Sequence, residues 1–165
     1  MAAGYLGLSH PNWCSTILRS HPSRCAFWRG SERRFKVLEP GSPFFLLKKS
    51  RPGRPIEDRT VIGRAEYLHF DVQPIGRLPQ EYDLNELGVA SETELRLRLR
   101  EIAGDGHDQV GVIVLGPLEP FRSPVRWSTL PRLGIKFARQ VVSGMGLDET
   151  QVERLLDAGL YGTAD

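Results

Sequence analysis

FKVLEPGSPFFLLKKSRPGRPIEDRTVIGRAEYLHF, residues 35–70, is the stretch that we expect to decide the fold. Short apolar runs occupy residues 35–38 and 43–47, and residues 39–42, EPGS, form a typical turn sequence between them. A third run, rich in β-branched and aromatic residues, begins at residues 60–63 and continues to the end of the stretch. The pattern predicts three strands, the first two joined by a tight turn.

The segment between the second and third strands is rich in cations and unsuited to a helix. Residues 50–55, SRPGRP, hold two prolines, which lack an N–H donor, and a glycine. We therefore expect a loop on the sheet that carries Lys48, Lys49, Arg51, Arg54 and Arg59. A cationic loop of this kind is suited to binding a phosphate backbone. The alternative that composition allows is a solvated loop at the edge of the sheet.

Composition is that of an ordinary globular chain. With 165 residues, 40% hydrophobic and 25% charged, the chain is long enough for one well-buried domain. It has no run of about 18 apolar residues, so we expect no membrane span, and its first ten residues do not resemble a signal peptide. We therefore expect a cytoplasmic protein. Cys14 and Cys25 lack CxxC spacing, so two reduced thiols are expected rather than zinc, and neither a metal nor a cofactor is predicted.

Charge is distributed unevenly along the chain. Residues 1–60 hold eleven Lys/Arg against four Asp/Glu, whereas residues 61–165 hold eleven against sixteen. Eighteen of the 22 basic residues are arginine, whose planar fork suits bidentate contacts to phosphate and to guanine edges. The asymmetry points to an anionic partner for the first half of the chain.

The remaining elements follow from hydrophobic periodicity and capping residues. Residues 92–103 form an amphipathic helix with Leu95, Leu99 and Ile102 buried, and Ser91 with Glu94 forms a capping box before it. Further elements are expected as strands at 5–8, 110–115 and 137–142, helices at 11–20 and 80–87, and a terminal helix that begins after Asp148. Residues 117–131 are interrupted by prolines, and residues 143–146 separate the terminal helix from the strands before it.

Two features outside residues 35–70 are candidate contacts to an anion or a base. Arg96 and Arg100 project together from one face of the helix 92–103, which is either a solvated surface or a second contact to an anion. Phe27 and Trp28 lie among arginines in an aperiodic segment, where an aromatic pair either stacks on a base or covers the end of a small barrel.

Catalytic motifs are missing from the sequence. There is no GxGxxG or Walker loop, no GxSxG elbow and no HExxH spacing among the four histidines. His107-Asp108 is better explained as a turn than as an acid–base pair. The chain is therefore expected to be a binding module and not an enzyme by itself.

The order of motifs resembles the N-terminal DNA-reading domain of type IV HNH restriction endonucleases, which attack modified DNA. The matching stretches are GYLGLSH at 4–10 with Trp13, FW at 27–28, FKVLEPGSPFF at 35–45, RTVIG at 59–63, VGVIVL at 110–115 and VVSG at 141–144. The resemblance covers roughly residues 4–148. Gly63-Arg64-Ala65 replaces the GGG of the family, and residues 51–57 lengthen the loop before that strand.

This resemblance implies a fold and a domain organisation. The fold would be α+β and PUA-like, a small curved β-barrel with flanking helices. Residues 1–146 would form the modified-DNA-binding domain, and residues 147–165 a C-terminal helix or linker toward an HNH nuclease domain outside this sequence. The chain by itself would bind double-stranded DNA and not cut it.

The resemblance also implies a target and a site. The target would be phosphorothioate DNA. Pro79 and Tyr82 of this chain would form an apolar dimple for its sulfur atom. Contacts to bases and phosphates would come from Lys49, Arg51, Arg54, Arg59, Arg77, Arg96 and Arg100. Three alternatives stay open: a reader that flips 5-methyl- or hydroxymethylcytosine into a pocket near Trp28 or Trp127, a PUA-like module that binds RNA or a small ligand, and an enzyme whose site is not evident.

Overall fold

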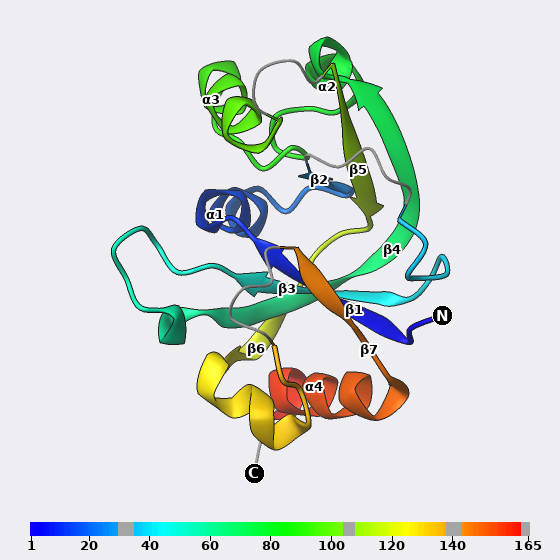
Figure 1. Ribbon diagram of the computed structural model, residues 1–165, viewed down its shortest axis with the longest axis vertical. Coiled ribbons are helices and arrows are strands. Elements are labelled where there is room, and N and C mark those ends of the chain that lie inside the picture. The colour runs from blue at the N-terminus through cyan, green and yellow to red at the C-terminus, as the bar shows by residue number, and fades with distance from the viewer. Residues whose placement is uncertain (30–34, 104–107, 138–142, 163–165) are drawn as a thin grey trace.

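The long curved strand β4 (Thr60–Pro74) organises the molecule (Figure 1). The computed structural model describes residues 1–29, 35–103, 108–137 and 143–162. Within these ranges the strands form one sheet in the order β2-β5-β4-β3-β1-β7, and β6 pairs with the first part of β4. Their bounds are β1 Gly4–Ser9, β2 Cys25–Arg29, β3 Pro43–Lys48, β5 Gln109–Leu115, β6 Glu119–Arg126 and β7 Gly144–Leu147.

Irregular pairing bends β4 so that it serves three neighbours. Its first half pairs antiparallel with β3 and β6, and its second half pairs antiparallel with β5. Each pairing shifts register once, as β-bulges do where a strand must curve. At Gly63 a Cβ atom would lie 2.5 Å from the Glu119 carbonyl oxygen, so glycine permits the close approach of β6. The result is the small curved barrel expected from the sequence.

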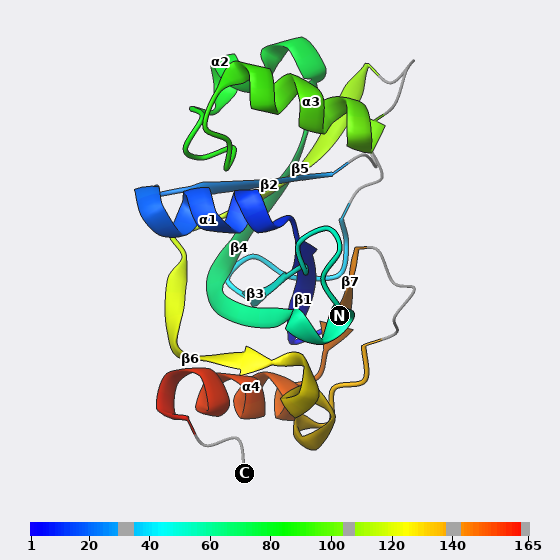
Figure 2. The same ribbon diagram turned by 90° about the vertical axis from the view of Figure 1, so that its left-hand side faces the viewer.

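Helices cover the sheet from two sides. Helices α1 (Pro11–Ser20) and α3 (Glu92–Ala103) lie on the same side of the molecule, which faces the viewer in Figure 2. Helix α4 (Glu149–Tyr161) lies beside β6 at the opposite end from α3. Short helical turns complete the set: α2 (Leu78–Glu81) and the 3-10 turns η1 (Ile56–Asp58), η2 (Ile75–Arg77) and η3 (Trp127–Leu133).

Strand β3 is central because both of its faces are covered. Phe44 and Leu46 belong to the core beneath α1, whereas Phe45 and Leu47 belong to the core shared with α4. All four side chains are fully buried. This explains why the sequence of β3 is continuously apolar rather than alternating. A third core, under α3, contains Trp28, Leu95 and Leu99.

The predicted first hairpin is wrong. Residues 35–38 form no strand, although Phe35 and Leu38 are buried. The two sides of β3 are occupied by β1, in parallel, and by β4, so residues 35–38 have no edge of β3 to pair with. Strands β2, β6 and β7 were missed. In particular β7, whose first residues were expected only to separate the terminal helix from the strands, pairs antiparallel with β1.

Other predicted elements are confirmed or corrected. Strands β1 and β5, and helices α1, α3 and α4, lie where the sequence places them. The helix expected at 80–87 is instead α2, which ends at Glu81 because Tyr82 is extended and the Arg24 guanidinium donates to the Glu81 carbonyl at 3.0 Å. The strand expected at 137–142 falls almost entirely outside the described residues, and so does the Ile102 side chain.

The terminal helix belongs to the folded unit. Helix α4 begins after Asp148, as the sequence predicts, and Asp148 and Gln151 form a capping box with reciprocal hydrogen bonds. Leu155 and Ala158 are buried in the core shared with β3 and β6. Whether the chain continues toward a nuclease domain stays a prediction. None of the helices in the described ranges has the length and apolar character needed to span a membrane.

Candidate nucleic-acid interface

The loop at residues 49–59 projects from the sheet beside α1 (Figures 1 and 2). Its conformation is held internally. The Ser50 hydroxyl donates to the Pro55 carbonyl at 2.6 Å, and Arg54 forms an ion pair of 2.8 Å with Asp58. Arg51 and Arg54 are exposed. The loop is therefore an ordered protrusion that presents cations to solvent, as the sequence predicts.

At the base of this loop, cations from several elements converge on Lys49. The Lys49 backbone N–H donates to the Ser9 carbonyl at 2.9 Å, which ties the end of β3 to the start of α1. The ammonium group is half-buried, and its pKa lies below the usual value because of burial and because of the positive charges of Arg59 and Arg98. Like charges held together in this way are unfavourable unless an anion joins them.

Arg98, on α3, is the most deeply buried of these cations. It is 7% exposed, its guanidinium lies 4.9 Å from the centroid of the Trp28 ring, and burial lowers its pKa. Its Nε and Nη1 atoms are buried and have no hydrogen-bond acceptor among the residues that the structure describes. An unsatisfied buried donor of this kind costs about 1–3 kcal/mol, and more when charged.

His10 joins the cluster from the start of α1. It is the N-cap residue, and its Nδ1 accepts from the Asn12 N–H at 3.1 Å. The His10 pKa is lowered by burial and by the charge of Arg98. Because α1 begins at the next residue, the positive end of its dipole also lies at this point. We call His10, Lys49, Arg59 and Arg98 the cation cluster.

Arg59 connects the cluster to Trp127, at the start of η3. Its guanidinium lies 5.2 Å from the Trp127 ring centroid, and the Trp127 backbone N–H donates to the Arg59 carbonyl at 3.0 Å. Trp127 is half-buried and also contacts the Phe137 ring edge-on at 5.8 Å. Arg59 thus contacts the Trp127 ring and lies near enough to Lys49 to lower the pKa of its ammonium group.

Arg96 and Arg100 lie on the exposed face of α3, as predicted. Arg96 approaches Glu92 at 3.8 Å, one helical turn away, in a largely solvated pair. A contact of this kind is weak, so Arg96 remains available to an external anion.

The structure does not bring Arg77, Pro79 and Tyr82 to the loop. Arg77 and Pro79 are exposed on η2 and α2, at the opposite end of β4 from Arg59. Tyr82 is 4% exposed, its hydroxyl donates to Asp71 at 2.9 Å, and the Arg24 guanidinium covers its ring at 4.5 Å from the centroid. Burial and the Asp71 carboxylate raise the Tyr82 pKa. Pro79 and Tyr82 therefore do not share an exposed dimple.

Trp28 is likewise unavailable for stacking on a base. It is 6% exposed beneath Arg98, and its indole N–H donates to the Leu87 carbonyl at 2.8 Å. His10 and Arg98 were not predicted from the sequence to belong to a site. Two signals for them were present: His10 stands directly before a proline that opens a helix, and Arg98 follows Leu95 by three residues, on the buried stripe.

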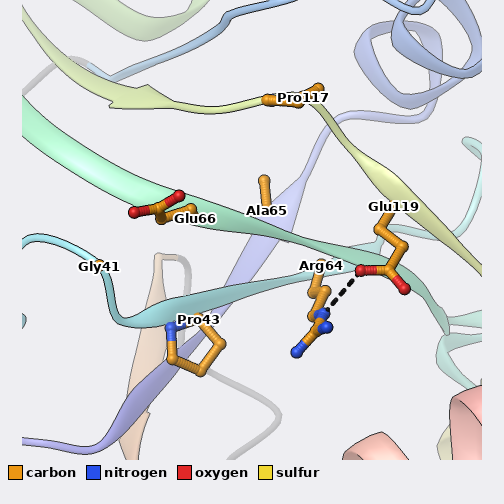
Figure 3. Close-up of a pocket in the computed structure, with 7 residues that line it drawn as sticks. All are labelled: Gly41, Pro43, Arg64, Ala65, Glu66, Pro117 and Glu119. Atoms are coloured by element: carbon orange, nitrogen blue, oxygen red, sulfur yellow. Dashed lines mark hydrogen bonds and ion pairs between the residues drawn. The ribbon is translucent and has the colours of Figure 1, made fainter.

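Of the cavities lined by described residues away from the loop, two bear on ligand binding. The first, of about 340 Å³, contains the pair of Arg64 and Glu119, which meet at 3.0 Å, together with Glu66 (Figure 3). Its two carboxylates and single guanidinium do not suit a phosphate. The second, of about 470 Å³, is lined by the rings of Phe35, Tyr67 and Phe70, near the end of β3 opposite the loop.

Comparison with solved structures identifies the fold. The ASCH protein from Zymomonas mobilis superposes with a TM-score of 0.68 at 17% identity, over 94% of each chain. Human THYN1, solved in complex with DNA that contains 5-methylcytosine, superposes with a TM-score of 0.54 at 11% identity, over 94% of this chain and 96% of THYN1. A hypothetical protein from Leishmania major gives 0.58 at 10% identity, over 96% of this chain and 95% of that protein.

These similarities show an α+β, PUA-like fold, as the sequence predicts. At such identities they do not assign a ligand. No protein-family model and no curated protein sequence matches the chain.

Proposed function

We propose that this chain is a DNA-binding domain that recognises a chemically modified duplex. The observation that carries the proposal is the convergence of His10, Lys49, Arg59 and Arg98 at the base of a loop that presents Arg51 and Arg54. A positive surface of this extent, with an ordered protrusion at its centre, suits the phosphates that border a groove of DNA. We include Arg96 and Arg100, which are exposed on another face of α3 than Arg98, as further contacts to phosphate.

A phosphorothioate linkage is the first candidate for the modification, supported by the order of sequence motifs. Sulfur is larger and less well hydrated than oxygen, so its recognition needs an apolar contact beside cationic donors. Because Tyr82 is buried, that contact would involve Pro79 without Tyr82, or exposed prolines of the loop such as Pro52 and Pro55.

A second candidate is 5-methylcytosine, favoured by the similarity to human THYN1 in complex with DNA carrying that base. A flipped base needs a slot lined with rings, and the cavity at Phe35, Tyr67 and Phe70 has such a lining. In both cases the chain binds without cleaving, and cleavage would belong to an HNH domain outside residues 1–165.

Fluorescence anisotropy with one duplex of about 10 base pairs, a single helical turn, tests the proposal. The duplex is prepared unmodified, with one phosphorothioate and with one 5-methylcytosine, and an RNA duplex of the same sequence is included. We expect tightest binding to one modified DNA and a steep loss of affinity with salt. Equal binding to all four duplexes would reject modification reading, and a preference for RNA would reject the DNA assignment.

The double variant Arg51→Ala, Arg54→Ala locates the surface. If each arginine contacts one phosphate, the slope of log affinity against log salt should fall by about 2. Arg122→Ala, Arg154→Ala is the matched control, because both residues are exposed on β6 and α4, away from the loop.

A further inference from the structure

We propose that Arg98, Lys49 and His10 form a specific binding site for one tetrahedral oxyanion, at the junction of α1, α3 and the end of β3. The inference deepens the proposed function and depends on it for one point only, that the oxyanion is a phosphate group of the bound nucleic acid. The site differs from the exposed cations of the loop because its central guanidinium is buried before any ligand arrives.

The unsatisfied donors of Arg98 carry the argument. Nε and Nη1 lie in the interior without an acceptor among the described residues, whereas buried guanidinium groups in folded proteins are normally paired or hydrogen-bonded. The neighbouring Trp28 ring makes a cation–π contact with the guanidinium. The N–H groups point outward within the guanidinium plane, so this ring does not accept hydrogen bonds from them. Two buried donor groups of this guanidinium, Nε and Nη1, therefore lack an acceptor that an oxyanion could supply.

The carboxylates nearest to Arg98 do not serve as its acceptors. Glu94 and Glu101 lie one turn to either side on α3 and favour its charged form, but burial outweighs them. The Glu94 carboxylate instead accepts the Ala90 N–H at 2.7 Å, in the cap that begins α3. Neither glutamate makes an ion pair or hydrogen bond with Arg98 in the part of the chain that the structure describes.

Lys49 and His10 complete the donor set from two other elements. Each is near enough to Arg98 for its pKa to be lowered by that charge. The Nδ1 atom of His10 accepts a hydrogen bond from the Asn12 N–H, so Nε2 is the ring nitrogen that remains to contact a ligand. A doubly charged oxyanion between these groups would replace mutual repulsion by attraction, and α1 would add the positive end of its dipole.

Sulfate is the probe of choice because its charge does not change between about pH 5 and 8, the range in which a histidine titrates. Calorimetry and thermal unfolding of the full chain at constant ionic strength should show saturable binding at millimolar sulfate. Arg98→Met should abolish this binding and, without sulfate, melt at a higher temperature than wild type, since the unsatisfied charge is gone. Arg19→Gln, exposed at the far end of α1, is the charge-matched control and should bind sulfate as wild type does.

His10 gives the site a pH dependence with a defined sign. An oxyanion raises the depressed His10 pKa, so sulfate affinity should increase as pH falls through the histidine range. The other charged groups that face the cluster are Arg59, Lys48, Glu94 and Glu101. His10→Asn keeps a good N-cap residue and should remove the pH dependence.

Nucleic acid is tested in parallel with the same variants. Loss of one buried charged contact should weaken duplex binding about 10- to 100-fold in Arg98→Met and in Lys49→Gln. Lys49→Gln keeps the test valid if Arg98→Met does not fold. The inference is overturned if either variant binds sulfate as wild type does, or if wild type binds none. Duplex binding that persists without sulfate binding would leave the proposed function intact, whereas sulfate binding without duplex binding would reject only the nucleic-acid source.

Discussion

Gly88→Ala should destabilise the protein strongly, because Gly88 meets two constraints at once. Its φ of +68° lies in the left-handed region, where a Cβ atom costs about 1–2 kcal/mol. That Cβ would also lie 2.1 Å from Cδ1 of Trp13, a ring that is 2% exposed. The indole must move to admit a methyl group.

The displacement of Trp13 determines the magnitude. Overpacking a buried ring typically costs about 1–3 kcal/mol. Movement of the ring also weakens the bond from its Nε1 to the Ala26 carbonyl, now 3.1 Å, which contributes about 0.5–1.5 kcal/mol. Together with the backbone strain, we expect Gly88→Ala to lower the free energy of unfolding by about 3–5 kcal/mol, a large share of the stability of a typical domain.

Gly53→Ala is the matched control. Gly53 has a similar φ of +81°, but no heavy atom lies within 4 Å of the position that a Cβ atom would take, so only the backbone term of about 1 kcal/mol applies. Urea unfolding followed by tryptophan fluorescence measures both variants. With a slope of about 2 kcal/mol per molar urea, the midpoint should fall by about 1.5–2.5 M for Gly88→Ala and about 0.5 M for Gly53→Ala. Equal shifts would refute the packing argument.

Three further outcomes are expected. Cys14 and Cys25 are fully buried, with thiol pKa values raised to about 12, so both should react with a thiol reagent at neutral pH only as fast as the chain unfolds; rapid labelling of the native protein would contradict their burial. Tyr82→Phe should cost about 1–2 kcal/mol of stability through the lost bond to Asp71, and should leave the preference for phosphorothioate over unmodified DNA unchanged; a lost preference in a folded variant would place Tyr82 in the ligand site. Because the Lys49 pKa is depressed, its proton opposes folding below the folded-state pKa, and stability rises with pH from there toward the ordinary value of 10.5. Lys49→Gln should be more stable than wild type at pH 7, and that difference should shrink as pH rises through this window; a constant difference would exclude the mechanism.

Local sequence patterns determined the elements that carry their own signals. The capping box of Asp148 and Gln151 fixed the start of α4, and the periodicity of Leu95 and Leu99 fixed the buried face of α3. The prolines and glycine of residues 50–55 excluded a helix and left an ordered basic loop. These features depend on contacts within a few residues of chain, which a linear pattern records.

Tertiary structure decided which strands pair and which side chains meet. The apolar run at 35–38 looks like a strand, but β1 and β4 already occupy both edges of β3, and sequence cannot show that competition. From the sequence, Tyr82 is predicted to lie in a helix and to be available to a ligand. In the fold, Arg24, which is 58 positions earlier in the chain, covers its ring.

The cation cluster depends on the fold in the same way. His10, Lys49 and Arg98 come from α1, the end of β3 and α3, and each is ordinary in its own segment. Their effect on one another arises from distance and burial, because like charges interact strongly only when the chain brings them together out of water. The sequence determined that the first half of the chain is basic; only the fold gathered part of that charge around the one buried guanidinium of α3 that lacks an acceptor in the described residues.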